Sequence, residues 1–422
     1  MGLLVDLTPL RLHPDFRRLW VGNALAGVGA NLAATAISLQ VYALTGSPFS
    51  VGLVGLFGLV PLVVLGLYGG AVVDTYDRRT VAIWGSVVMW LVAMLNVLQA
   101  ALGNTNEWVL YGLVALNSAA FGVVSPARQA IYPRILEREL LPAANSLSSL
   151  AMSTSMLLGP MAAGFLVDLS GYTVTYAADA ALFVFAMWGL WRLAPVPPLT
   201  DGPRRVPGIR SVLDGLSYLA KRPNLRMSFL TDFCAMILAH PRALYPAIAA
   251  VALGGGARTV GILAAATAAG ALVTSLLSGR LGGVRWQGRA VVLAVTGWGV
   301  SVAGFGFFVL AATRGWVDPT TALAGAVVML ALAGASDTIS MVFRTTIVQA
   351  AAEDHMRGRL QGVFIVVVAG GPRLGDVLAG SLGELSLEWA ALIGGVACVV
   401  ALAGLVAAQR GFLRYDAHHP EP

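Results

Sequence analysis

The chain has 422 residues, of which 57% are hydrophobic and only 11% are charged, and its mean hydropathy is +0.78. Soluble domains carry about 25% charged residues, so this composition excludes a soluble protein, and it excludes a disordered chain or a disulfide scaffold as well. The formal net charge is +6, and the distribution of the basic residues decides which partner that charge serves.

Apolar stretches long enough to cross a membrane recur along the whole chain. A helix crosses the hydrocarbon core with about 20 residues. Twelve stretches meet this requirement: 18–45, 49–73, 80–102, 107–127, 143–168, 173–194, 226–253, 258–280, 290–312, 320–343, 359–383 and 388–409. We therefore predict an all-α membrane protein with twelve transmembrane helices. The first stretch follows a charged N-terminus and is full length, so no cleaved signal peptide is expected.

The basic residues fix an orientation. With the N-terminus inside, the inner segments hold 23 of the 27 basic residues, the outer loops hold Arg258 and Arg314, and the spans hold Arg242 and Arg373. This bias follows the positive-inside rule and predicts cytoplasmic termini in a multi-pass membrane protein. Because the positive charge is spread over every inner loop, we expect anionic lipid headgroups at the inner face, and no nucleic acid, as the partner.

The chain divides near its middle. A proline-rich break over 195–210 is followed by the stretch 209–220, whose apolar residues share one helix face and predict an amphipathic helix on the inner membrane surface. We expect a six-helix bundle over 1–194, a cytoplasmic linker over 195–225, and a second bundle with a short tail over 226–422. Six plus six spans are typical of secondary transporters, whose binding site lies near the midplane between the halves.

The loop after the second span carries a recognisable motif. Its residues Gly70, Asp74, Arg78 and Arg79 resemble the signature between helices 2 and 3 of the major facilitator superfamily, and the loop departs from that signature at Thr75 and Asp77. The resemblance implies a conformational latch, in which an acid at a helix end pairs with a base and is released when the halves move.

Longer stretches resemble one branch of that superfamily, the enterobactin-exporter-like efflux proteins. They are Leu12–Trp20, Ser125–Asn145, Arg222–Pro246 and Met356–Leu360. The resemblance implies an exporter of the cell inner membrane that is driven by the proton gradient, with siderophores or amphipathic drugs as cargo. Within the fifth span, Gly159, Pro160 and Gly164 resemble the export motif of drug/proton antiporters, where they permit close packing and a bend. The fourth span departs from the pattern, since it offers Asn117 where many antiporters carry arginine.

Ionisable residues inside a span are functional candidates by default, and all the deep ones belong to the second half. We predict proton coupling by Asp337, Asp232 and His240. Cargo would contact Arg242, Asn31, Asn117, Phe233 and Tyr245. Gating would use Arg344, Arg373 and Asp376 together with the loop motif.

Each of these residues also has a purely structural explanation. Arg373 and Asp376 can pair at i, i+3, and Asp232 can bridge Arg226 or Arg344 at an inner gate. Arg242 can bond a carbonyl that Pro241 frees, and His240 can be a packing residue. Asp168 and Asp179 are expected at the solvated outer rim.

The sequence shows no chemistry of bond cleavage. It has no Walker loop, nucleophile elbow or metal-ligand spacing, so we expect a protein that is not an enzyme and needs no cofactor or metal. The prediction is a monomeric secondary transporter that exports an amphipathic small molecule against protons by alternating access. An uncoupled facilitator, an importer, a lysolipid flippase or a non-transporting membrane receptor are the alternatives.

Overall fold

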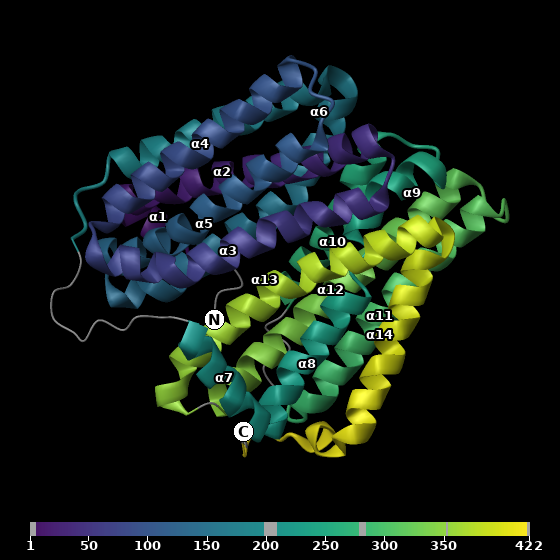
Figure 1. The fold of residues 1–422 in the computed structure, drawn as a ribbon. Helices are drawn as coiled ribbons and strands as arrows, with labels where there is room; N and C mark the ends of the chain where they lie inside the picture. The colour runs from purple at the N-terminus through teal and green to yellow at the C-terminus, as the bar shows by residue number, and fades with distance from the viewer. Residues whose placement is uncertain (1–5, 198–208, 278–283, 352, 420–422) are drawn as a thin grey trace. The chain divides into compact units, whose positions relative to one another are not determined.

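The fold is that of a computed structural model, which describes residues 6–197, 209–277, 284–351 and 353–419; over 67–75, 209–212, 354–362 and 364–367 it describes the backbone only. Within these ranges every regular element is a helix (Figure 1). The internal contacts divide the chain into two compact units, Met1–Leu44 with Phe57–Gly208 (unit 1) and Thr45–Leu56 with Ile209–Pro422 (unit 2). The boundary at 208 falls inside the expected linker.

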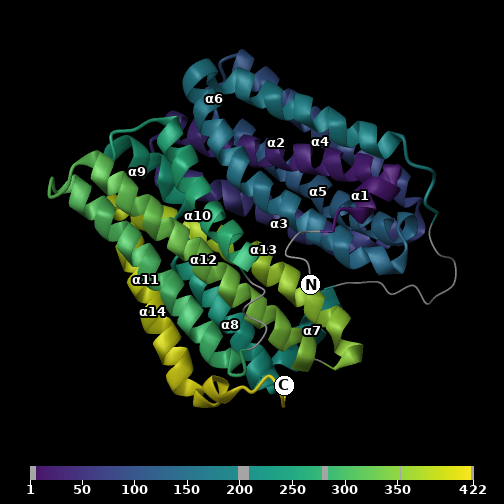
Figure 2. The ribbon, with the colours of Figure 1, turned by 180° about the vertical axis from the view of Figure 1, so that it is seen from behind.

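Unit 1 is built from long helices in which α4 packs along both α5 and α6 (Figure 2). Polar residues set several of the starts: the Asp77 carboxylate accepts the N–H of Thr80 before α4, and the Asn106 side chain accepts that of Trp108 before α5. The helices are α1 Thr8–Leu12, α2 Pro14–Thr45, α3 Pro48–Thr75 (its first residues belong to unit 2), α4 Arg78–Ala101, α5 Glu107–Ile135, η1 Arg138–Leu140 and α6 Leu141–Trp191.

The longest helix, α6, is two arms joined at a break. Gly171 has φ 76° and ψ −179°, a conformation open to glycine alone. The expected fifth and sixth spans, 143–168 and 173–194, lie on either side of this residue. Gly171 therefore forms the turn that separates the two spans.

In unit 2, α11 packs against both α12 and α14, and α10 packs on the other side of α12. Its core includes Trp298, Val302, Phe343 and Ile347, all buried. The elements are α7 Ile209–Lys221, α8 Pro223–Leu238, η2 Arg242–Leu244, α9 Tyr245–Val251, α10 Ala257–Leu277, α11 Gln287–Thr313, α12 Pro319–Ala351, α13 Asp354–Leu385, α14 Leu387–Ala408 and η4 Arg410–Arg414.

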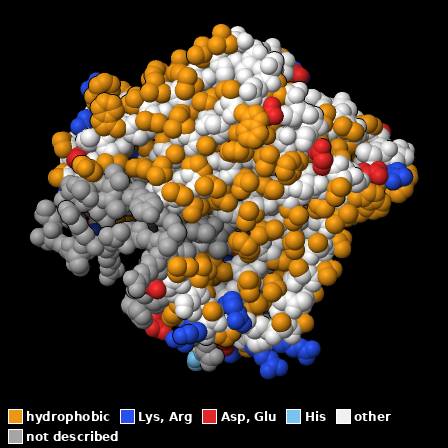
Figure 3. Space-filling view, viewed as in Figure 1, with side chains coloured by type: hydrophobic (Ala, Val, Ile, Leu, Met, Phe, Trp, Pro, Cys, Tyr) orange, Lys and Arg blue, Asp and Glu red, His pale blue; other side chains and the backbone are white. Residues whose placement is uncertain are grey.

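Ten helical segments among the described residues are long and apolar enough to cross a membrane. One of them, Arg138–Trp191, contains two of the twelve expected spans, and the expected span 359–383 lies on α13, which is not among the ten. Twelve crossings and cytoplasmic termini stay predictions. Large apolar side chains such as Trp84, Leu293 and Val400 are exposed, and Figure 3 shows hydrophobic side chains spread over the helix surfaces in view. Such a surface suits lipid rather than water.

The amphipathic helix expected over 209–220 is present as α7, which packs against α8 and α13. Leu219 is buried while Leu213 and Leu216 are exposed. The end of α7 is tied to the segment before α13: Arg222 Nη2 lies 2.6 Å from Glu353 Oε1, and the Tyr218 hydroxyl donates to the same oxygen.

The C-terminal tail folds back against the start of α11. Arg285 donates from Nε and Nη2 to Asp416 Oδ2 at 2.9 and 2.7 Å, and the N–H of Ala417 donates to the Arg285 carbonyl. Phe412 and Tyr415 are buried beneath this connection. The Arg285 guanidinium and the backbone N–H of His418 together lower the pKa of Asp416 from 3.8 to about 2.

We predict that Asp416→Asn loosens the tail. Because the folded-state pKa of Asp416 is lowered, its stabilising contribution is complete above about pH 4 and is lost only as the pH falls toward 2. Hydrogen–deuterium exchange at pH 7 should therefore be faster at the tail amides of the variant. The exposed Arg414 provides a control, since Arg414→Gln should leave that exchange unchanged; equal exchange in both variants would show that the ion pair does not hold the tail.

Candidate functional site

The seventh expected span is a broken helix, and Pro241 lies at the break. The helix α8 ends at Leu238, Ala239 leaves the helical region at φ −127°, and a single turn, η2, leads into α9. The break releases the carbonyl of Ala239, which accepts the indole N–H of Trp298 at 3.0 Å. The explanation in which the Arg242 guanidinium bonds a carbonyl that Pro241 frees is not met, because Arg242 forms no hydrogen bond among the described residues and the Ala239 carbonyl is bound by Trp298 on α11.

Four ionisable residues gather at this break and form the outer cluster: His240, Arg242, Arg373 and Asp376. His240 Nε2 lies 3.7 Å from Asp376 Oδ1, with both side chains mostly buried. Arg373 Nη1 donates to the carbonyl of Ala369 at 2.8 Å. The i, i+3 ion pair between Arg373 and Asp376 is therefore not formed, because the carboxylate lies beside His240 and the guanidinium bonds its own helix.

Within the described part of the chain, Arg242 forms no hydrogen bond and no ion pair, although it interacts electrostatically with His240, Asp376 and Arg373. Its side chain is half-buried. The outer cluster thus holds two guanidinium groups against one carboxylate. In a medium of low dielectric constant such an excess of positive charge attracts an anionic group.

Three further residues form the inner cluster: Asp232 on α8, with Arg344 and Asp337 on α12. Arg344 Nη1 forms an ion pair with Asp232, and Nη2 lies 3.8 Å from Asp337 Oδ1. The side chains of Arg344 and Asp232 are 8% and 6% exposed, whereas that of Asp337 is 37% exposed. Of the two bases considered for Asp232, the structure selects Arg344, since Arg226 donates to Gln409 and to the Ala220 carbonyl.

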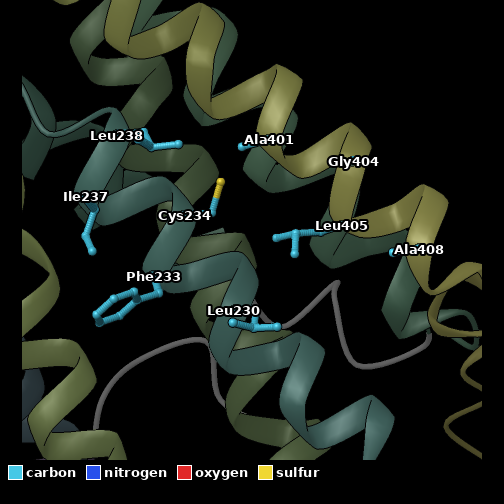
Figure 4. Close-up of a pocket in the computed structure, with 9 residues that line it drawn as sticks. All are labelled: Leu230, Phe233, Cys234, Ile237, Leu238, Ala401, Gly404, Leu405 and Ala408. Atoms are coloured by element: carbon cyan, nitrogen blue, oxygen red, sulfur yellow. The ribbon is translucent and has the colours of Figure 1, made fainter.

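Two predicted cargo residues of unit 2 pack against apolar neighbours. Tyr245 is buried and packs edge-on against Phe305, with ring centroids 6.0 Å apart. Phe233 lines an apolar groove of about 510 Å³ between α8 and α14 (Figure 4), together with Leu230, Cys234, Ile237, Leu238, Ala401, Gly404, Leu405 and Ala408. Tyr245 also interacts electrostatically with Arg242 and Asp376 of the outer cluster, whereas no contact with either cluster is described for Phe233.

In unit 1 the export motif brings two helices together. A Cβ on Gly159 would lie 2.5 Å from Asn31 Cβ and 2.8 Å from the Val28 carbonyl oxygen, so α6 approaches α2 at a distance that glycine alone permits. Pro160 and Gly164 are buried in the same arm. The Asn31 amide donates to Gly27 on its own helix, and Asn117 is half-buried on α5.

The structure describes only part of the loop motif. At Gly70 and Asp74 it describes the backbone alone. Arg79 donates to the carbonyls of Leu190 and Trp191, at 3.3 and 2.8 Å, and so caps the C-terminal end of α6. Arg78 reaches the Ala130 carbonyl at 3.4 Å.

Arg128 follows the expected end of the fourth span at 127, yet it is a half-buried charge on a continuous helix. The helix α5 continues to Ile135, and Arg128 Nη2 donates to the buried Ser86 at 2.8 Å while its guanidinium lies over the Phe183 ring. The sequence pattern could have indicated this position, because the apolar residues Val124 and Ile131, four before and three after Arg128, place it on the buried face of the helix.

The prediction that Asp179 lies at the solvated outer rim is also wrong. Asp179 is buried, and Tyr176 and Phe183 on the same face of α6 are buried with it. Its short distance from the end of the span suggested an exposed position. Exposure also depends on the face of the helix that a residue occupies, and Asp179 lies on the buried face.

These features are typical of one class of protein, helical membrane transporters with broken helices and paired charges within the spans. Solved structures agree on the fold. The nucleoside transporter NupG aligns with a TM-score of 0.70 at 15% identity, over 93% of this chain and 98% of that one. A POT family transporter in complex with 5-aminolevulinic acid gives a TM-score of 0.72 at 10% identity, over 95% and 97%. At such identities the likeness concerns the fold alone.

The sequence comparisons then give the family. Residues 5–419 match the transmembrane secretion effector family of the major facilitator superfamily, and the chain belongs to it. The enterobactin exporter EntS of Shigella boydii serotype 18 is 28% identical over 385 residues, which cover 90% of this chain and 88% of that protein, and EntS of Escherichia coli O139:H28 gives the same figures. The chain is thus a multi-pass transporter of the inner membrane.

The inner cluster leads to a prediction about stability. Removing one member of a buried ion pair leaves an uncompensated charge and costs about 3–5 kcal/mol, whereas replacing both members is often nearly neutral. Asp232→Leu should therefore lower the free energy of unfolding of the purified protein far more than the double variant Asp232→Leu/Arg344→Met does. Chemical denaturation in detergent measures these values together with that of Arg344→Met alone, and simple additivity of the two single variants would contradict the pairing.

Proposed function

We propose that the protein is a proton-coupled exporter of amphipathic small molecules, siderophores or drugs, that works by alternating access. The observation that carries the proposal is the inner cluster, in which one buried guanidinium, Arg344, serves two carboxylates of unequal exposure. Membership of a secretion family and the enterobactin exporter relatives support the outward direction.

The proton step follows from the charge balance of the inner cluster. Water can reach Asp337, whose side chain is 37% exposed, whereas Asp232 is held under Arg344. A proton on Asp337 removes its attraction for Arg344, which at ~4 Å and an effective dielectric constant of ~20 has an upper bound of about 4 kcal/mol. A differential interaction of a few kcal/mol is enough to shift an equilibrium between two conformations.

The outer cluster suits the cargo. Arg242, which has no hydrogen bond and no ion pair among the described residues, can bind an anionic group, with Arg373 adding to the positive potential. His240 and Asp376 stand beside it, so a proton on either one would strengthen that potential. This arrangement favours an amphipathic cargo that carries a negative charge.

In the same proposal, the bundles over 1–194 and 226–422 are the moving bodies, joined by the linker 195–225, and Asp74 with Arg78 is the latch of the inner loop. Protons, an amphipathic small molecule and anionic inner-leaflet lipids are its partners, and the monomer is the working unit.

Asp337→Asn should abolish the dependence of export on the pH gradient, because the amide cannot exchange a proton while its shape is kept. The measurement is cargo movement in proteoliposomes with an imposed pH gradient, using siderophores and cationic and anionic drugs in turn. Asp318→Asn is the matched control, since it changes an exposed carboxylate at the start of α12 to another good N-cap residue. Undiminished proton-driven export by Asp337→Asn would remove Asp337 from the mechanism.

Arg242→Gln should weaken the binding of an anionic cargo about 10-fold or more, with a much smaller effect on a neutral analogue, since only the charged group meets the guanidinium. Concentration dependence of transport gives the KM for each cargo. Arg314→Gln removes a guanidinium that is paired with Glu388 at the outer end of unit 2, and it should leave both values alone. An equal loss for charged and neutral cargo would exclude an anion site at Arg242.

A further inference from the structure

The helix α2 and the second arm of α6 run closely together through unit 1, and glycine makes the approach possible. A Cβ on Gly22 would lie 2.7 Å from the Phe185 carbonyl oxygen, and one on Gly189 would lie 2.8 Å from that of Arg18. About two turns beyond Gly22 along α2, a Cβ on Gly29 would lie 2.5 Å from Asp179 Oδ1 and 3.3 Å from Asp179 Cα. The Asp179 carboxyl therefore fills the space that the missing side chain of Gly29 leaves.

This contact lies near the middle of the membrane-spanning helix. Gly29 is fifteen residues after the start of α2 at Pro14 and sixteen before its end at Thr45, about 22–24 Å from each at ~1.5 Å per residue. Asp179 is 7% exposed. Over the part of the chain that the structure describes, its carboxyl has neither a hydrogen bond nor an ion pair. An ionised carboxylate in such a place carries a penalty of several kcal/mol.

The surrounding elements offer no compensating charge. Residues 19–45 of α2 and 80–101 of α4 contain no acidic, basic or histidine residue. From α5 the nearest base is Arg128, which donates to Ser86 and lies over Phe183, a full turn away from Asp179 along α6. On α6 itself the titratable neighbours are Tyr172 and Tyr176.

Tyr176 does not supply a hydrogen bond either. Its hydroxyl donates to Gln40 Oε1 at 2.7 Å, and Gln40 and Gln99 exchange two amide hydrogen bonds of 3.0 Å. This buried network ties α2, α4 and α6 together, and the Tyr176 proton is used within it.

We propose that Asp179 is a proton-binding site of unit 1: its carboxyl holds a proton while α2 and α6 are packed as they are here, and releases that proton when water enters between them. Packing and protonation are then linked, since closure of the two helices favours the neutral acid and hydration favours the carboxylate. A role for this proton in driving transport rests on the function proposed above, whereas the binding of the proton does not.

Infrared difference spectroscopy on the full-length protein in lipid bilayers tests the binding itself, because a protonated carboxyl has a carbonyl band separate from that of a carboxylate. At neutral pH the wild type should show this band, Asp179→Asn should lack it, and Asp179→Glu should shift it. Asp168→Asn, which changes the exposed acid at the end of the first arm of α6, should retain it. A spectrum of Asp179→Asn identical to that of the wild type would overturn the proposal.

Gly29→Ala provides a test that keeps the acid. The added methyl group occupies the carboxyl's space, so the helices separate, water enters, and the infrared band should weaken at neutral pH; Gly112→Ala on α5, where a Cβ would meet nothing within 4 Å, should leave it unchanged. An undiminished band in Gly29→Ala would show that packing does not control the proton.

Transport measurements separate this proposal from the previous one. If wild-type proteoliposomes show no proton-driven export, the proposed function fails while the infrared result stands. If the wild type is proton-driven, Asp179→Asn should reduce the number of protons exchanged per cargo, and an unchanged ratio would exclude Asp179 from coupling.

Discussion

Charge and hydrogen-bonding groups in this chain must find partners within the protein, because hydrocarbon offers none. The structure meets this requirement by pairing Arg344 with Asp232, by placing His240 beside Asp376, and by closing the broken seventh span with the indole of Trp298. Among the described residues, Arg242 and Asp179 have no hydrogen bond and no ion pair, so binding an anion at the first or a proton at the second would lower the free energy of the buried group. The candidate sites follow from these exceptions.

Much of the fold could be predicted from the sequence, since apolar length and charge at the helix ends are local properties. The break at Gly171 and the amphipathic helix α7 both fall where the sequence placed a boundary and a helix. The ends of helices were predicted less well: α5 was expected to stop at 127, yet it continues to Ile135, because a helix with charged residues can extend beyond its apolar part.

The contacts of the site could be predicted only in part. The sequence correctly offered Arg344 as a partner of Asp232, as a base on another span at a similar depth. It paired Arg373 with Asp376 by spacing along one helix, but it could not know that α8 breaks so as to bring His240 to the same carboxylate. Asp179 was misjudged for a similar reason, since burial depends on which helix lies opposite, and Gly29 is distant in sequence.

The bond from Trp298 to the carbonyl of Ala239 has a mechanical consequence. It joins α11 to α8 at the point where the backbone of the seventh span is least regular. Any bending at that point either stretches this bond or moves α11 in step with α8. The stiffness of the seventh span therefore depends on a neighbouring helix that carries no ionisable group between Arg289 and Arg314. A conformational change at the break then moves both helices together.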